Sequence, residues 1–110
     1  MERRRDVFQA IADPTRRHIL GLVIDKPRTA GDIAIEFDSR RQTISRHLKI
    51  LVECGLLRAS KSGREIRYSL NAEAFKAIAE FVQPFRKLYD ERAGTLEVLM
   101  QYYDSEQTGF

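Results

Sequence analysis

Cysteine and histidine are scarce in this 110-residue chain, which contains one Cys and two His. A single cysteine forms no disulfide within the chain, as is usual in a reducing compartment. No apolar run approaches the roughly 18 residues of a membrane span, and the stretch from Met1 to Arg5 has no signal-peptide pattern. We therefore expect a cytoplasmic protein with no membrane partner.

Catalytic groupings are missing as well. Cys54 has no histidine in a polar cluster with it, no glycine-rich phosphate loop occurs, and the serines fall in turns, helix caps or a polar helix. We expect no enzyme activity and no cofactor.

The composition and the charge distribution narrow the class of protein. The chain is 43% hydrophobic and 32% charged, which is typical of a globular protein, and its length suits one domain. Residues 1–71 carry 15 Lys/Arg and 9 Asp/Glu, a net +6, whereas residues 72–110 carry 4 and 7, a net −3. Residues 39–67 alone carry 8 and 2, again +6. This concentration of positive charge indicates a nucleic-acid partner.

The segment from Ser39 to Leu57 carries most of the functional information. Ser39 and Gln42 form an S-x-x-Q capping box, which predicts that a helix starts there, and Gly55 predicts its end. Ile44, Leu48 and Leu51 form its apolar stripe. The other side is polar, and we expect it to bind DNA through Arg40, Arg41, Gln42, Thr43, Ser45, Arg46 and Lys49. Such side chains pair with guanine, adenine and phosphate groups in the major groove.

These polar side chains are expected to divide their roles. Base edges are assigned to Arg41, Gln42, Thr43 and Arg46, and phosphates to Ser45 and Lys49.

Shorter elements surround this helix. The apolar spacing predicts helices over residues 4–12, 14–24 and 29–37, with Asp13-Pro14 and Thr29 at the starts of the second and third. Residues 57–70 alternate like two strands around a turn at 62–64, which predicts a β-hairpin. Its basic residues are further candidates for contacts with DNA: Arg58, Lys61, Arg64 and Arg67.

The last part of the chain has a heptad pattern. Apolar residues in steps of three and four predict a helix over 72–103, interrupted in pattern at Arg92, with Pro84 expected to kink or break it. Such a helix is about 48 Å long at ~1.5 Å per residue, too long for a domain of this size to bury. We expect it to form a homodimer with help from the first helix, through Phe8, Ile11, Phe75, Ile78, Val82, Phe85, Tyr89, Leu96 and Leu99.

In this order, the elements predict a mainly α fold with a small β-hairpin: a winged helix-turn-helix with a long C-terminal dimerisation helix. Residues 1–103 would form the single domain, with the wing at 57–70 and the dimerisation helix at 72–103. Residues 104–110 would form a flexible tail. In this fold the fourth helix enters the major groove of DNA and the wing contacts the flanking backbone.

Several strings resemble the ArsR family of bacterial repressors over roughly residues 5–100. They are Ala12 to Arg17 (ADPTRR), Ser45 to Leu51 (SRHLKIL), Gly55 to Leu57 and Tyr68 to Asn71. The region from Phe81 to Leu96 resembles the C-terminal helix of a metal-independent branch of this family. The resemblance implies a homodimer that blocks a promoter by binding an inverted-repeat operator. Arg40 stands where many relatives carry a capping serine, so Ser39 is expected to take over that role.

Four other interpretations remain beside the metal-independent repressor. Metal sensing is disfavoured because residues 36–42 contain no Cys or His and residues 72–103 contain no His. Regulation through oxidation of Cys54 or through a small-molecule effector would keep the same fold. A winged-helix module that binds proteins is the alternative from another class.

Overall fold

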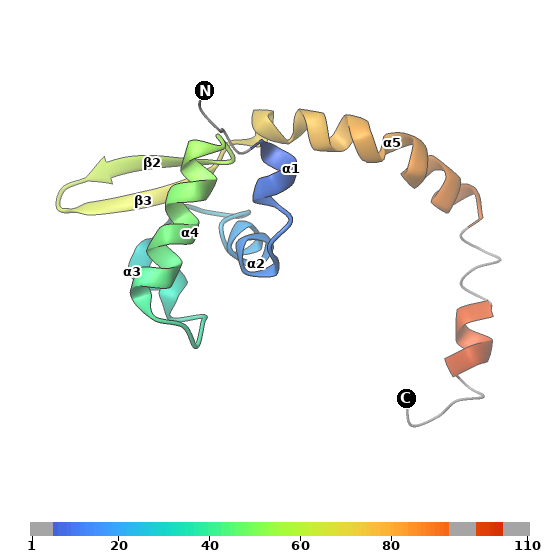
Figure 1. Cartoon of the computed structure of the whole chain (residues 1–110), viewed down its shortest axis with the longest axis horizontal. Helices are drawn as coiled ribbons and strands as arrows, with labels where there is room; N and C mark the ends of the chain where they lie inside the picture. The colour runs from blue at the N-terminus through green and yellow to red at the C-terminus, as the bar shows by residue number, and fades with distance from the viewer. Residues whose placement is uncertain (1–5, 93–98, 105–110) are drawn as a thin grey trace. The chain divides into compact units, whose positions relative to one another are not determined.

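The structure, a computed structural model, describes residues 6–92 and 99–104. It divides into two compact units, and the boundary lies between Ile78 and Ala79. The first unit contains these elements in chain order (Figure 1): α1 (Val7–Ala10), α2 (Pro14–Leu22), β1 (Arg28–Thr29), α3 (Ala30–Ala34), α4 (Arg41–Glu53), β2 (Leu57–Ser62), β3 (Glu65–Leu70) and the 3-10 helix η1 (Ala72–Phe75). The helix α5 (Lys76–Glu91) starts at the end of this unit, and residues 99–104 are also helical.

Side chains at the helix starts explain where α1 and α2 begin. Asp6 and Gln9 form a capping box, in which the Gln9 backbone N–H donates to Asp6 Oδ1 over 2.8 Å and the Asp6 N–H donates to Gln9 Oε1 over 3.1 Å. Asp13 caps α2 by accepting from the Arg16 N–H over 3.1 Å, and Pro14 occupies the first helical position. The role predicted for Asp13-Pro14 is confirmed.

One apolar core joins the elements of the first unit. Ile19 and Val23 of α2, Ile33 of α3 and the stripe of α4 are almost completely buried. Leu56 and Leu57 complete this core where α4 leads into β2. The α4 stripe predicted from the sequence, Ile44, Leu48 and Leu51, has exposed fractions of 0%, 1% and 0%. Full burial of these residues fixes which side of α4 faces outward.

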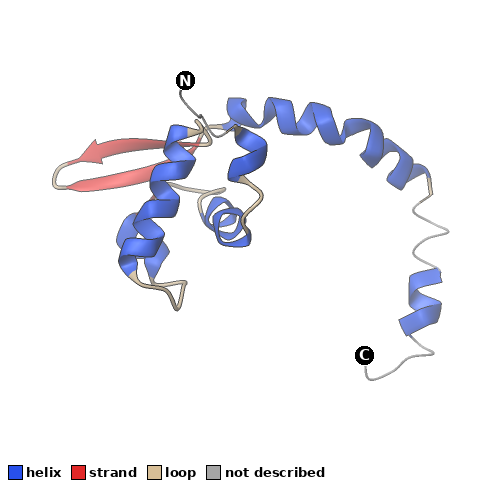
Figure 2. Cartoon of the chain, viewed as in Figure 1, coloured by secondary structure: helices blue, strands red, loops and turns tan. Residues whose placement is uncertain are grey.

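The sheet has one strand more than the hairpin expected from the sequence. Its antiparallel order is β1-β3-β2, so β3 is central. The hairpin of β2 and β3 is drawn as the red arrows of Figure 2. The two-residue β1 pairs Arg28 with Tyr68 and Thr29 with Arg67. A strand this short carries no alternation of its own, and only its pairing with β3 reveals it. The winged-helix fold class itself is confirmed.

The C-terminal region differs from a single α-helix over 72–103. Residues 72–75 form η1 rather than α-helix, and α5 ends at Glu91 with Arg92 in a turn. Pro84 lies inside α5 without ending it. The residues around Pro84 are exposed, so the carbonyl that loses its N–H donor can bond to water instead. Gly94 follows Arg92 in the sequence and lowers helix propensity there.

Candidate nucleic-acid interface

The helix α4 starts one residue later than the sequence suggested. Its N-cap is Arg40 in an extended conformation, with no capping hydrogen bond from a side chain. The expected capping box of Ser39 and Gln42 is therefore wrong. An exposed helix start can bond its first N–H groups to water, so the fold does not require a capping side chain here. Ser39 lies in a bend before the helix, and Gln42 occupies the second helical position.

One face of α4 is polar and open to solvent. Outside the buried stripe, the helix exposes all the residues within it that the sequence assigned to DNA: Arg41, Gln42, Thr43, Ser45, Arg46 and Lys49. Arg40, at the N-cap, is exposed too. The structure thus brings these residues together on one helix, as the periodicity predicted. Their individual contacts with bases or phosphates stay predictions.

The end of α4 is built around Gly55. Its φ is +83°, a left-handed conformation that favours glycine. The Leu56 N–H donates to the Leu51 carbonyl and the Gly55 N–H donates to the Val52 carbonyl, both over 3.0 Å, which is the Schellman arrangement. The glycine stop predicted from the sequence is confirmed.

Asn71 fastens the end of the wing to this turn. Its Nδ2 donates to the Gly55 carbonyl over 2.8 Å and its backbone N–H donates to the Leu56 carbonyl over 2.9 Å. Asn71 is also the N-cap residue of η1, but its side chain makes no capping hydrogen bond there. The side-chain amide of Asn71 instead bonds to the Gly55 carbonyl, which lies within hydrogen-bond distance. The wing therefore has a fixed connection to α4.

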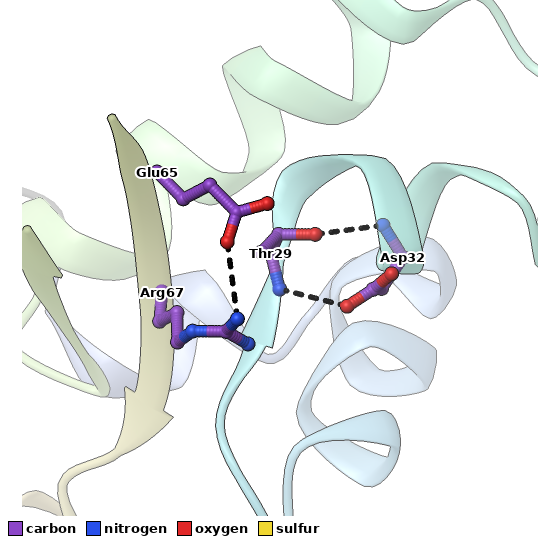
Figure 3. Close-up of polar contacts among 4 residues, drawn as sticks. All are labelled: Thr29, Asp32, Glu65 and Arg67. Carbon is purple, nitrogen blue, oxygen red and sulfur yellow. Dashed lines mark hydrogen bonds and ion pairs between the residues drawn. The ribbon is translucent and has the colours of Figure 1, made fainter. Parts of the chain in front are cut away.

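The helix α3 supports α4 and has a reciprocal cap at its start (Figure 3). The Asp32 N–H donates to Thr29 Oγ1 over 3.1 Å, and the Thr29 N–H donates to Asp32 Oδ2 over 3.3 Å. The pKa of Asp32 is lowered by hydrogen bonds from the Thr29 backbone and side chain, and further by the charges of Arg67 and Arg28, although burial acts to raise it. The carboxylate therefore stays ionised and keeps the cap intact. The start predicted for this helix is confirmed, but α3 ends at Ala34 instead of Phe37.

The strand register places the basic residues of the wing on different faces. Leu57, Tyr68 and Leu70 are on the face that packs on the core, and Lys61, paired with Ile66, shares that face. Arg58 is on the opposite face. Arg64 lies in the two-residue turn after Gly63, whose φ of +64° suits the first central position of a type II′ turn. All three basic side chains are exposed.

Arg67 is engaged within the protein. It lies on the central strand β3, and its Nη2 is 3.0 Å from Glu65 Oε1 (Figure 3). The sequence placed Arg67 at the edge of a hairpin, because it gave no sign that β1 would pair with this strand. Half-exposed ion pairs of this kind contribute little stability, but they hold the guanidinium near β1 and α3.

A polar groove lies between the wing and the first turns of α3 and α4. Its volume is about 370 Å³. Arg41 and Arg64 line it together with Tyr68 and with Glu65, whose carboxylate is paired with Arg67. At Gly31 an added Cβ would lie 3.9 Å from Arg41 Nη2. Two arginines thus face one groove beside the exposed side of α4, an arrangement suited to an anionic backbone.

Contacts of the two histidines were not visible in the sequence. The His18 ring packs edge-on against Phe37 with centroids 4.7 Å apart. His47, on α4, has its Nδ1 3.2 Å from Arg16 Nη1 on α2. Burial acts to raise the pKa of Asp13, at the start of α2, but the hydrogen bond from the Arg16 backbone and the positive charge of Arg16 outweigh it, so the pKa is lowered. Only the fold brings Arg16 and His47 together, because 31 positions separate them.

The residues assigned to a dimer seam fall into two groups. Phe8, Val82, Phe85, Tyr89 and Leu99 are exposed. Ile11, Phe75 and Ile78 instead pack partly buried against the core of their own unit, so they add less to an exposed patch than the heptad pattern suggested. Leu96 lies outside the described residues.

The exposed apolar surface of α5 also includes residues that the heptad seam omitted, Phe81 and Leu88. The rings of Phe81 and Phe85 lie 5.4 Å apart, with exposed fractions of 58% and 59%. Because they are four residues apart, the two rings lie on the same side of the helix. The heptad pattern included Phe85 in the seam but left out Phe81.

The first unit also has an apolar recess of about 520 Å³. Its lining is mostly aliphatic and aromatic and includes Leu20, Ile24, Leu70 and Phe75, with Arg17 as the charged member. Ile11 and Ile78, both assigned to the dimer seam, line it as well.

Two further properties concern only the described residues. None of their helices has the length and apolarity needed to cross a membrane. Among residues 6–92 and 99–104, no three His, Cys, Asp or Glu side chains gather in a way that could hold a metal ion.

Comparison with known proteins connects this geometry to a family. Residues 11–58 match the profile of a helix-turn-helix domain. The chain is 47% identical to the transcriptional repressor SdpR of Bacillus subtilis over 66 residues, covering 60% of this chain and 73% of that protein. It is 31% identical to a probable mercury resistance operon repressor of Streptomyces lividans over 90 residues, covering 82% of this chain and 70% of that protein.

A solved structure agrees with both. The crystal structure of an ArsR family transcriptional regulator superposes with a TM-score of 0.66 and 32% identity, over 76% of this chain and 91% of the other. Together with the buried stripe, the polar face and the wing of the described fold, these similarities show that the chain belongs to the ArsR family of winged helix-turn-helix transcriptional repressors.

Proposed function

We propose that this repressor acts as a homodimer that binds an inverted-repeat operator, blocks a promoter and does so without sensing a metal ion. In this proposal the DNA-binding elements, the wing and the C-terminal region up to residue 103 act as one functional domain. The observation that carries the proposal is the two-sided helix α4. Its inner stripe is fully buried, while its outer face consists of residues that hydrogen-bond to base edges and phosphates.

The wing supports the same proposal. Arg64 at the turn and Arg41 at the start of α4 line one polar groove, so both can approach the backbone of a duplex that α4 reads. Lys61 shares the sheet face of Ile66 and Tyr68, two other residues of this groove. Because phosphate contacts position a protein on DNA, Arg64 and Lys61 of the wing are assigned to anchoring, whereas Arg41 keeps its assignment to base edges.

Exposed apolar surface supports the homodimer. Five large apolar side chains of α5 are 41–59% exposed: Phe81, Val82, Phe85, Leu88 and Tyr89. Together they expose a larger apolar area than single scattered residues do on a monomer. The apolar recess beside Ile11 and Phe75 gives a second copy a place to bury such side chains. A two-fold dimer presents two α4 helices to two half-sites, which accounts for an inverted repeat.

Metal independence rests on the inventory of ligands. The sequence contains one Cys and two His, and the protein already uses each histidine, His18 against Phe37 and His47 with Arg16. Cys54 lies partly buried at the end of α4 and packs against the core. A mercury resistance repressor is among the relatives, so this part of the proposal needs its own test.

The alternatives make different predictions. Regulation by oxidation would act through Cys54, and regulation by a small molecule would use the apolar recess, which the sequence did not reveal. A protein-interaction module would leave the polar face of α4 without a DNA ligand. The recess is assigned to the dimer because residues of the predicted seam line it.

DNase I footprinting upstream of the protein's own gene tests the proposal. We expect protection of a site with two half-sites about one helical turn apart, ~34–36 Å. The variant Gln42→Ala should lose this protection at protein concentrations where Glu53→Ala, on the same helix but at its far end, retains it. Protection of a single half-site would contradict the homodimer, and no protection of any promoter region would contradict promoter blocking.

A further inference from the structure

The Arg16 side chain contacts two helices besides its own. Its Nε donates to the Ala10 carbonyl over 2.7 Å and its Nη2 donates to the Gln9 carbonyl over 3.2 Å, both at the end of α1. Its Nη1 lies 3.2 Å from His47 Nδ1 on α4. The Arg16 backbone N–H also donates to Asp13, which fixes the residue at the start of α2. One guanidinium thus joins the end of α1 to the middle of the proposed recognition helix.

The chemistry of this contact determines the state of the histidine. Arginine has only donors, so His47 Nδ1 must accept, and the ring proton must lie on Nε2. The contact therefore selects one tautomer and one ring orientation. His47 immediately precedes Leu48, a fully buried residue of the α4 stripe, so a fixed ring also restrains α4 along its axis.

The neighbouring Arg17 provides a natural comparison. Its Nη1 donates to the Ile11 carbonyl over 2.8 Å, so it also holds the end of α1. Arg17 has no hydrogen bond to α4 among those of the described residues. Arg16 and Arg17 have the same charge, lie on the same helix and both donate to carbonyls at the end of α1, but only Arg16 contacts His47.

We infer that Arg16 is a positioning residue that couples α1 to the recognition helix through His47. This inference rests on the proposed DNA-binding role of α4 and extends it. The first helix carries Phe8 and Ile11, which are assigned to the homodimer. A change in the position of α1 at the dimer interface therefore reaches α4 through Arg16, and the spacing of two α4 helices must match the spacing of two half-sites.

A double-mutant cycle on operator affinity, measured by fluorescence anisotropy, tests the coupling. Arg16→Gln should weaken binding about 3- to 30-fold, the range for residues that act on a binding site without touching its ligand. Arg17→Gln, which removes the same charge, should change affinity less than about twofold. In a His47→Leu background, Arg16→Gln should cost no further affinity, because the bond is already absent.

Two readouts separate positioning from a general loss of structure. Nitrogen-15 NMR of the imidazole should show the Nε2–H tautomer in the wild type and a mixture in Arg16→Gln. His47→Gln, which keeps an acceptor oxygen, should bind the operator more tightly than His47→Leu. If Arg16→Gln does not fold, the comparison of these two His47 variants still tests the coupling.

Three results would overturn the inference. They are equal losses of operator affinity for Arg16→Gln and Arg17→Gln, additive losses in the double mutant, and a His47 tautomer that is the same in the wild type and in Arg16→Gln. A wild-type protein that binds no operator would instead contradict the proposed function.

Discussion

Replacing Asn71 with Asp tests the connection between the wing and α4 by changing one group. The side-chain amide donates to the Gly55 carbonyl over 2.8 Å. An ionised carboxylate has the same shape but only acceptors, so two oxygens would face each other where a hydrogen bond stood. Losing the bond costs about 0.5–1.5 kcal/mol, and leaving a part-buried carbonyl without a donor costs about 1–3 kcal/mol. Because the second cost already includes the lost bond, we expect Asn71→Asp to lower the free energy of unfolding by about 1–3 kcal/mol.

The pH dependence of this variant has a definite sign. The repulsion should raise the pKa of the introduced carboxyl in the folded state, so the penalty is fully present above that raised pKa. It disappears as the pH falls through the range where the carboxyl gains a proton and becomes a donor. The difference in stability between variant and wild type should thus narrow on acidification.

Urea unfolding at pH 7 and pH 4 measures both effects, with Asn71→Ala as the control that removes the donor without adding a charge. We expect Asn71→Ala to lie between the wild type and Asn71→Asp at pH 7. A loss below about 0.5 kcal/mol for Asn71→Asp, or equal losses for the two variants at both pH values, would show that this hydrogen bond does not hold the wing to α4.

Three further predictions concern the wing, the dimer and the regulation. Arg64→Ala should lower the salt dependence of DNA binding by close to one unit, and an unchanged slope would mean that the turn of the wing points away from DNA. Phe85→Glu should shift the protein from dimer to monomer in sedimentation, because it places a charge in an apolar interface. A wild-type monomer of 12.8 kDa would contradict the dimer. Chelator or zinc should change operator affinity less than tenfold, about 1.4 kcal/mol of coupling. A larger change would contradict metal independence, and an oxidant effect that vanishes in Cys54→Ser would support the redox alternative.

The sequence predicted those parts of the fold that depend on local periodicity and on turn chemistry. The stripe of Ile44, Leu48 and Leu51 and the stop at Gly55 follow from residues close together in the chain, and the structure confirms them. The capping box at Ser39 failed because the pattern S-x-x-Q shows only that a cap is possible, and an exposed helix start can use water instead.

Features that depend on distant residues were not predictable in this way. β1 exists only through its pairing with β3, and the bond between Arg16 and His47 joins residues 31 positions apart. The partial burial of Phe75 and Ile78 depends on their packing against the core of the first unit, which a heptad count does not contain. For the candidate interface, periodicity predicted the polar face of α4, whereas the place of Arg67 on a central strand, paired with Thr29 of β1, required the sheet.

Base reading by α4 is the central claim, and operator affinity across single-base variants tests it most directly. Fluorescence anisotropy would compare the wild type with Gln42→Ala on the operator and on each of its substituted forms. We predict a loss of about 1–3 kcal/mol on the intact operator and the loss of discrimination at one base pair only, because one side chain reads one position. If Gln42→Ala instead weakened binding equally on every sequence, the exposed face of α4 would anchor the protein without reading bases, and the account would be wrong.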